Sequence, residues 1–130
     1  MAFVLPILVG CVLVVLLSLI PEPRRLQFNA IFVAGAGAAY LSGGGFGGWE
    51  FVFTAAATWC AYRGLRSWNW IGVAWLLHTG WDLAHHFKGH PIIPFAHDSS
   101  LGCAICDPVI ALWAFRGGPT LLPRTRRRLA

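Results

Sequence analysis

Five apolar segments, separated by short breaks rich in proline, glycine or arginine, constrain this chain more than any other feature. They cover about residues 2–20, 26–42, 49–65, 68–87 and 101–115. Each segment approaches the roughly 20 apolar residues that a helix needs to cross a bilayer. The chain is 57% hydrophobic and 12% charged, which is far from the composition of a soluble globular domain. We therefore expect one all-α domain, a polytopic membrane bundle of about five transmembrane helices.

The first apolar segment has two interpretations, a signal peptide or a retained helix. It has no basic region before its apolar run, and the run is followed by Pro21-Glu22-Pro23-Arg24-Arg25. A signal peptide usually begins with basic residues and ends at small residues that suit cleavage. Prolines and arginines instead resemble the end of a membrane span, so we favour a retained helix.

The distribution of positive charge predicts the orientation. With five spans, one side of the membrane receives Arg24, Arg25, Arg63, Arg66, Arg116 and the basic tail, whereas the other receives only Lys88. Because positive loops remain in the cytoplasm, we expect the N-terminus outside and residues 116–130 as a cytoplasmic tail. The expected location is the bacterial inner (cytoplasmic) membrane. Tail arginines suit anionic lipid head groups, and without a recognised binding module they do not indicate nucleic acid.

Nearly all side chains capable of chemistry lie between residues 78 and 107. In the fourth segment His78, Asp82, His85 and His86 are spaced i, i+4, i+7 and i+8, which places them on one face of a helix. In the fifth segment a second such face carries Cys103, Cys106 and Asp107, and Glu50 begins the third segment at the same side of the membrane. Ionisable groups are costly in hydrocarbon, so we expect these faces to meet in an outward-opening polar cavity.

These residue types favour a transition-metal site. Imidazole binds Zn, Cu and Fe, thiolate binds Cu(I) and Zn, and carboxylate adds a hard oxygen ligand. The predicted cofactor is accordingly a Zn, Cu or Fe ion. The candidate ligands are His78, Asp82, His85, His86, Cys103, Cys106 and Asp107. Such a site could serve an enzyme acting on a membrane lipid or another apolar substrate, or it could handle metal.

Other interpretations of the same residues stay open. His78 and Asp82, with Glu50 as a further candidate catalytic group, could transfer protons without a metal, as in a membrane isomerase or cyclase. The histidines and aspartates could instead pair with each other and hold helices in register, as in a non-catalytic subunit of a larger membrane complex. Cys103 and Cys106 could form a disulfide or a redox-active pair in an oxidising compartment.

Small residues in the second apolar segment allow helices to approach closely. Gly35 and Ala39 are four residues apart, the spacing at which small residues share a face. Tight packing inside the bundle is the preferred interpretation, and a homodimer contact is the other. A small bundle makes a homo-oligomer or a larger membrane complex plausible in either case.

The stretch WLLHTGWDLAHHFKGHPIIPFAHDSSLGCAICDPVIALWAF, from Trp75 to Phe115, resembles a family of small bacterial integral membrane proteins of unknown function. This resemblance implies a five-span architecture and supplies no activity. The pattern His-x3-Asp-x2-His-His partly resembles the histidine boxes of membrane di-iron oxygenases and desaturases, which carry more histidines than the five found here. His78 and Asp82 are also similar to the His–carboxylate pair of five-helix sterol isomerases and related membrane cyclases, which implies intramembrane proton transfer.

Overall fold

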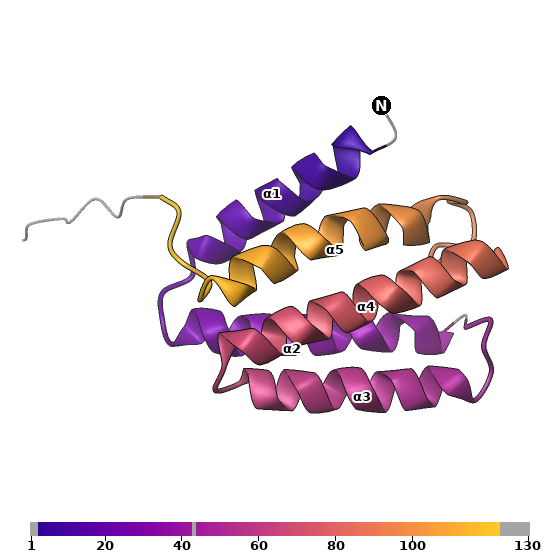
Figure 1. Ribbon diagram of the computed structural model, residues 1–130, viewed down its shortest axis with the longest axis horizontal. Coiled ribbons are helices and arrows are strands. Elements are labelled where there is room, and N and C mark those ends of the chain that lie inside the picture. Colours follow the sequence, from indigo (N-terminus) through magenta and orange to yellow (C-terminus); the bar gives the residue numbers. More distant parts are fainter. Residues whose placement is uncertain (1–2, 43, 123–130) are drawn as a thin grey trace, which may run out of the picture.

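The computed structural model describes residues 3–42 and 44–122, and within these residues the protein is all-α and contains no strand. The helices are α1 (Val4–Ser18), α2 (Arg24–Ala38), α3 (Trp49–Gly64), α4 (Trp68–Lys88) and α5 (Ser99–Phe115), and a short 3-10 helix η1 (Ala39–Ser42) extends α2 (Figure 1). The prediction of five helices is confirmed. Each helix begins and ends within a few residues of its predicted segment.

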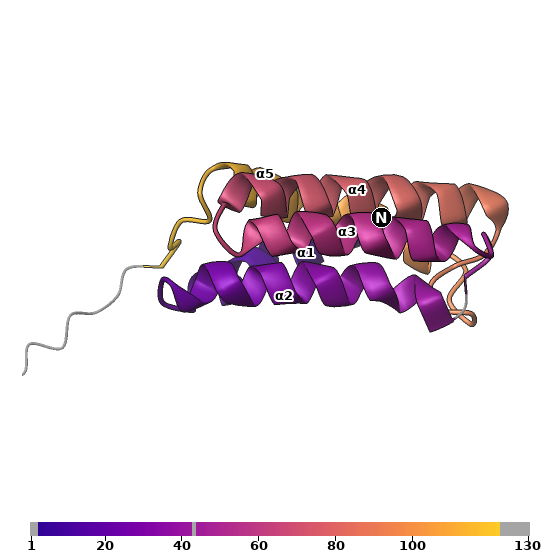
Figure 2. The same cartoon turned by 90° about the horizontal axis from the view of Figure 1, so that it is seen from below.

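The helices run up and down in sequence, so that neighbours along the chain are antiparallel. Figures 1 and 2 show α2, α3, α4 and α5 lying lengthwise beside one another, with α4 packed against α2, α3 and α5. Helix α1 packs mainly on α5, and its N-terminal half leans away from the rest of the bundle (Figure 1). The contact is close at Gly10, where an added Cβ would lie 2.9 Å from the Cys106 carbonyl oxygen.

Two buried apolar clusters hold the bundle together. The larger joins all five helices, and its most enclosed members include Val33, Ile71 and Ile110. The smaller lies toward the other end of α2 and α4 and contains Tyr40, Phe53 and Ala57. The polar residues of the predicted site lie beside this second cluster, because Tyr40 faces α4 near its C-terminal half.

Positive charge gathers at the end of the bundle that carries the α1–α2 and α3–α4 connections. Arg24, Arg25, Arg63, Arg66 and Arg116 flank these connections or follow α5. Arg25 is buried and donates to the carbonyl of Ser18 at 2.9 Å and to the Thr120 hydroxyl at 2.6 Å. The remaining arginines of the predicted basic tail, at positions 124, 126, 127 and 128, lie outside the described residues.

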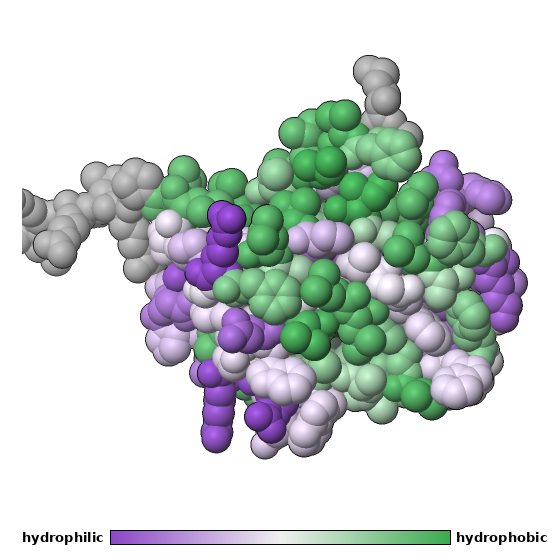
Figure 3. Space-filling view, viewed as in Figure 1, coloured by the Kyte–Doolittle hydropathy of each residue, from purple (hydrophilic) through white to green (hydrophobic). Residues whose placement is uncertain are grey.

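The outer surface of the bundle is strongly apolar. Large side chains on every helix face outward, among them Leu5 at 67% exposed, Ile31 at 68% and Phe51 at 70%. In the view of Figure 3, hydrophobic surface covers the middle of the molecule and hydrophilic groups gather toward its two ends. Across residues 3–42 and 44–122, none of the helices combines the length with the apolar character required of a membrane-crossing helix.

Candidate metal-binding site

The predicted polar stripe on α4 divides into an inward and an outward part. His78, Asp82 and His85 are buried, whereas His86 is only half-buried and its ring packs beside Phe87. Spacings of four and seven residues return a helix almost to the same direction, but a spacing of eight overshoots it by most of a quarter turn. His86 therefore does not join the other three residues.

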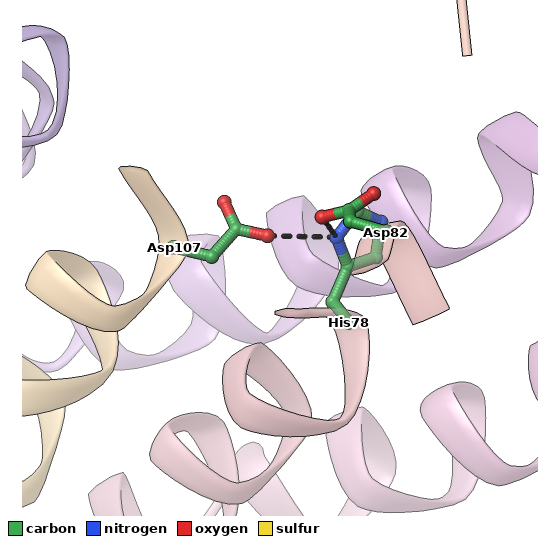
Figure 4. A group of neighbouring side chains, drawn as sticks. All are labelled: His78, Asp82 and Asp107. Atoms are coloured by element: carbon green, nitrogen blue, oxygen red, sulfur yellow. Dashed lines mark hydrogen bonds and ion pairs between the residues drawn. The ribbon is translucent and has the colours of Figure 1, made fainter. Parts of the chain in front are cut away.

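His78 lies between two carboxylates. Its Nδ1 atom is 2.7 Å from Asp107 Oδ2 on α5 and 3.1 Å from Asp82 Oδ2 one turn along α4. Figure 4 shows the Asp107 side chain reaching across from its own helix to the imidazole. All three residues are nearly inaccessible to solvent. We refer to these residues as the His78–Asp82–Asp107 group.

The second ring nitrogen of His78 has a partner that assigns its proton. Nε2 lies 2.9 Å from the backbone carbonyl oxygen of Ala36 on α2. A carbonyl oxygen can only accept a hydrogen bond, so Nε2 carries the hydrogen. Nδ1 is then the nitrogen that faces the two carboxylates, either as a donor or as a free ligand atom.

Tyr40 holds one of these carboxylates in place. Its hydroxyl donates to Asp82 Oδ1 at 2.5 Å and lies 2.8 Å from the Ser100 hydroxyl, which in turn accepts from the Ile92 backbone N–H at 2.9 Å. With Asp82 Oδ1 engaged by the tyrosine, Oδ2 is the oxygen left to face His78. A chain of hydrogen bonds thus links the α4–α5 loop to the buried group.

The arrangement has the form of a three-ligand metal site. One atom each from His78, Asp82 and Asp107 can be chosen so that all three lie within 4.8 Å of one another. A metal-binding histidine normally donates its other ring N–H to a carbonyl or carboxylate, and that bond fixes its orientation. The Ala36 carbonyl is this partner for His78, and the hydrogen bond from the Tyr40 hydroxyl fixes the orientation of Asp82 in the same way. The described residues thus contain a buried group able to hold a metal ion.

His85 belongs to a separate ion pair. Its Nε2 lies 2.9 Å from Glu50 Oε1 but is not aligned for a hydrogen bond, and its Nδ1–H donates to the His90 carbonyl at 3.0 Å. Glu50 also accepts from the Trp81 indole N–H at 2.9 Å and from the Phe46 backbone N–H at 3.1 Å. Seven residues of α4, about 10 Å of helix, separate His85 from His78.

The tyrosine ring separates the two ionic groups. Tyr40 stacks on His85 with ring centroids 4.0 Å apart, while its hydroxyl reaches Asp82. Trp81 and Phe46 pack edge-on against the same imidazole. Glu50 is therefore held beside His85, within an aromatic enclosure, and not beside the His78–Asp82 pair with which the sequence grouped it as a catalytic candidate.

Cys103 and Cys106 lie beside the His78–Asp82–Asp107 group without joining it. Both thiols are free in this structure, and both line a cavity of about 650 Å³ that also reaches His78 and Asp107. The potential ligand group among the described residues consists of one imidazole and two carboxylates. The geometry thus favours an oxygen-rich ligand set over a thiolate one.

Tyr40 and the Ala36 carbonyl are the members of the candidate site that the sequence did not predict. Tyr40 is one of only two tyrosines in the chain and ends the second apolar segment, at the same end of the bundle as Asp82. A tyrosine hydroxyl near the end of this segment was the available signal. A backbone carbonyl leaves no signal in a sequence.

A model of one protein family matches residues 1–120, which is nearly the whole chain. The chain belongs to the family of unknown function DUF6010. The match extends well beyond the Trp75–Phe115 stretch on which the sequence resemblance rested, so it includes α1 to α3 as well. Comparison with curated proteins and with solved structures found no match for this DUF6010 chain. Its chemistry must therefore be inferred from its own residues.

Proposed function

We propose that this protein is a multi-pass protein of the bacterial cytoplasmic membrane whose bundle holds a divalent transition-metal ion at His78, Asp82 and Asp107. Three protein ligands leave coordination positions open for water or a substrate, as in catalytic rather than structural zinc sites. One imidazole and two carboxylates suit Zn or Fe better than Cu(I), which prefers thiolates. The proposed role is metal-assisted chemistry on an apolar substrate.

The exposed apolar surface supports the membrane location. Side chains such as Ile31 and Phe51 would be in contact with water over two thirds of their area if the bundle were in solution. Contiguous exposed apolar surface of this kind marks a partner or a membrane. The mean hydropathy of α2, α3, α4 and α5 understates this outward face, because it also counts buried polar side chains, among them Asn29, Glu50, His78, Asp82, His85 and Asp107.

The bond between His78 Nε2 and the Ala36 carbonyl is the observation that carries the metal proposal. It reserves Nδ1 for the space between Asp82 and Asp107. Without that bond the ring could offer either nitrogen, and a simple ion pair would suffice to explain the contacts. A backbone carbonyl that accepts the other ring N–H is a usual support for a ligating histidine.

Elemental mass spectrometry of the purified protein tests the metal proposal. The protein would be extracted in mild detergent with no chelator and no histidine tag. We expect about one transition-metal ion per chain in the native protein and loss of that ion in His78→Ala. His86→Ala is the matched control, because it removes a histidine from the same helix that lies outside the group. A folded native protein containing no metal would overturn the proposal.

Metal-free proton transfer is the second candidate function, and one observation favours it. His78 Nδ1 is within direct hydrogen-bonding distance of both carboxylates, so a protonated imidazole would offset one of the two carboxylate charges without an ion. A histidine flanked by carboxylates is suited to accept and release protons. This candidate predicts metal-free protein in the same experiment, together with an apolar substrate that is turned over only when His78 and Asp82 are intact.

A further inference from the structure

The cavity beside the His78–Asp82–Asp107 group has an almost wholly apolar wall. It occupies about 650 Å³ between α1, α2, α4 and α5, and Leu13, Phe32, Trp75 and Ile110 line it. Pockets for small molecules are typically about 300–1,000 Å³. We propose that this cavity binds a single-chain lipid with an uncharged oxygen head group, such as a long-chain alcohol, with the head at His78 and Asp107.

The polar groups of the cavity explain the choice of head group. His78 and Asp107 border the cavity but are only 3% and 4% exposed, so they leave access for a single small group such as a hydroxyl, which could donate to the carboxylate. Two carboxylates and one protonated imidazole leave a net negative charge in a buried place, which repels an anionic head strongly at low dielectric. A bound divalent ion would only bring the group to about neutrality. An alcohol fits both states, whereas a fatty-acid anion is repelled by the group when no ion is bound.

The entrance of the cavity explains the choice of a lipid. Leu5, Val9 and Ile93 line the cavity and are also exposed, at 67%, 45% and 42%. The rim is therefore apolar, and a ligand that crosses it exchanges one hydrocarbon environment for another. Helix α1 supplies much of this rim and contacts α2 only slightly. An apolar chain would lie along α1 with its far end near the surface.

This inference rests on the membrane location proposed above and shares two residues with the proposed metal site, but it does not depend on a bound ion. Its test therefore targets the apolar wall and leaves His78 and Asp107 unchanged. Metal content is measured on the same samples. A failure of lipid binding with metal present, or the reverse, then separates the two proposals.

Photo-crosslinking in vesicles provides the test. The protein would be reconstituted in phosphatidylcholine vesicles with a long-chain alcohol that carries a diazirine in its chain, and labelled peptides would be mapped. We expect saturable labelling of α1 and α5 that unlabelled alcohol displaces. Val9→Trp fills the cavity and should weaken labelling roughly ten-fold, equivalent to about 1.4 kcal/mol of binding. Val12→Trp, on the same helix but outside the cavity, is the control.

Two results would overturn the inference. Labelling spread over the whole outer surface, and equal in the native protein and Val9→Trp, would mean that the alcohol behaves as bulk lipid. Displacement from metal-free protein by a fatty acid of the same length, as effective as by the alcohol, would contradict the uncharged head group. Unfolding of Val9→Trp is checked by its thermal midpoint, and Leu13→Phe, a smaller increase in the same wall, then replaces it.

Discussion

His78 on α4 is bonded through Nε2 to the carbonyl oxygen of Ala36 on α2, at 2.9 Å. The same carbonyl accepts the backbone N–H of Ala39, where α2 tightens into η1. The end of one helix thus assigns the proton of a histidine on another and directs the remaining nitrogen toward a carboxylate on a third. Three helices must be correctly placed for Nδ1 to face both aspartates.

Removal of the Tyr40 hydroxyl should destabilise the protein through Asp82. In Tyr40→Phe the ring can still stack on His85, but Asp82 Oδ1 loses its donor in a fully buried position. An unsatisfied buried acceptor costs about 1–3 kcal/mol, and more when it is charged. Thermal unfolding in detergent should show the loss, and Tyr62→Phe on the exposed surface should change nothing. An unchanged midpoint in Tyr40→Phe would mean that the bond contributes little.

The cysteines should be dispensable for metal binding. The double variant Cys103→Ser/Cys106→Ser leaves His78, Asp82 and Asp107 untouched, so we expect native metal content by elemental analysis. Asp107→Asn keeps the size of its side chain but removes a ligand charge, and it should lose most of the ion. Loss of metal in the serine variant with retention in Asp107→Asn would assign the site to the thiols instead.

The His85–Glu50 pair should affect stability but not metal content. His85→Ala leaves Glu50 buried without its counter-charge, and breaking a buried pair in this way costs about 3–5 kcal/mol. We expect a lower thermal midpoint with the metal retained in whatever fraction stays folded. The double variant Glu50→Gln/His85→Ala should recover part of the lost stability, because it leaves no unpaired charge in the interior. His97→Ala, an exposed histidine, serves as the neutral comparison.

The two neighbouring glycines of α2 should respond differently to a larger side chain. A Cβ at Gly37 would lie 2.9 Å from the Cβ of Ala57 on α3, whereas nothing lies within 4 Å of one at Gly35. Gly37→Leu forces α2 and α3 apart, and overpacking of this kind costs about 1–3 kcal/mol. Gly35→Leu should be neutral in thermal unfolding. If Gly35→Leu alone disrupts an oligomer seen by size-exclusion chromatography, that face is a homodimer contact.

Opposite ends of the bundle should lie on opposite sides of the membrane. In a cysteine-free background, Arg66→Cys and His97→Cys each place one thiol at an exposed position. A membrane-impermeant maleimide applied to intact bacterial spheroplasts should label position 97 and reach position 66 only after lysis. Labelling of both before lysis, or recovery of the protein in the soluble fraction, would contradict the proposed topology.

Helix bounds and the inward face of α4 were predictable because they depend on local features. Prolines and glycines mark the breaks, and the four-residue spacing of His78 and Asp82 survives in the fold. The side-chain partners on neighbouring helices were not predictable. The spacing of residues along one helix gives the direction and depth of each side chain, but it does not say which residue of another helix faces it. His85 therefore meets Glu50 at one depth, and His78 meets Asp107 at another. The seven-residue ligand set assumed that all these residues share one depth.

The N-terminal half of α1 leans away from the bundle (Figure 1), and α1 lines the cavity without helping to hold the His78–Asp82–Asp107 group. Every group that holds His78 in place belongs to α2, α4 or α5, whereas α1 contributes only hydrocarbon to the wall of the cavity. A shift of the first helix would therefore leave the bonds between the histidine and its aspartates unchanged. Substitutions along this face of α1 would likewise reshape the cavity without altering any polar atom of the group.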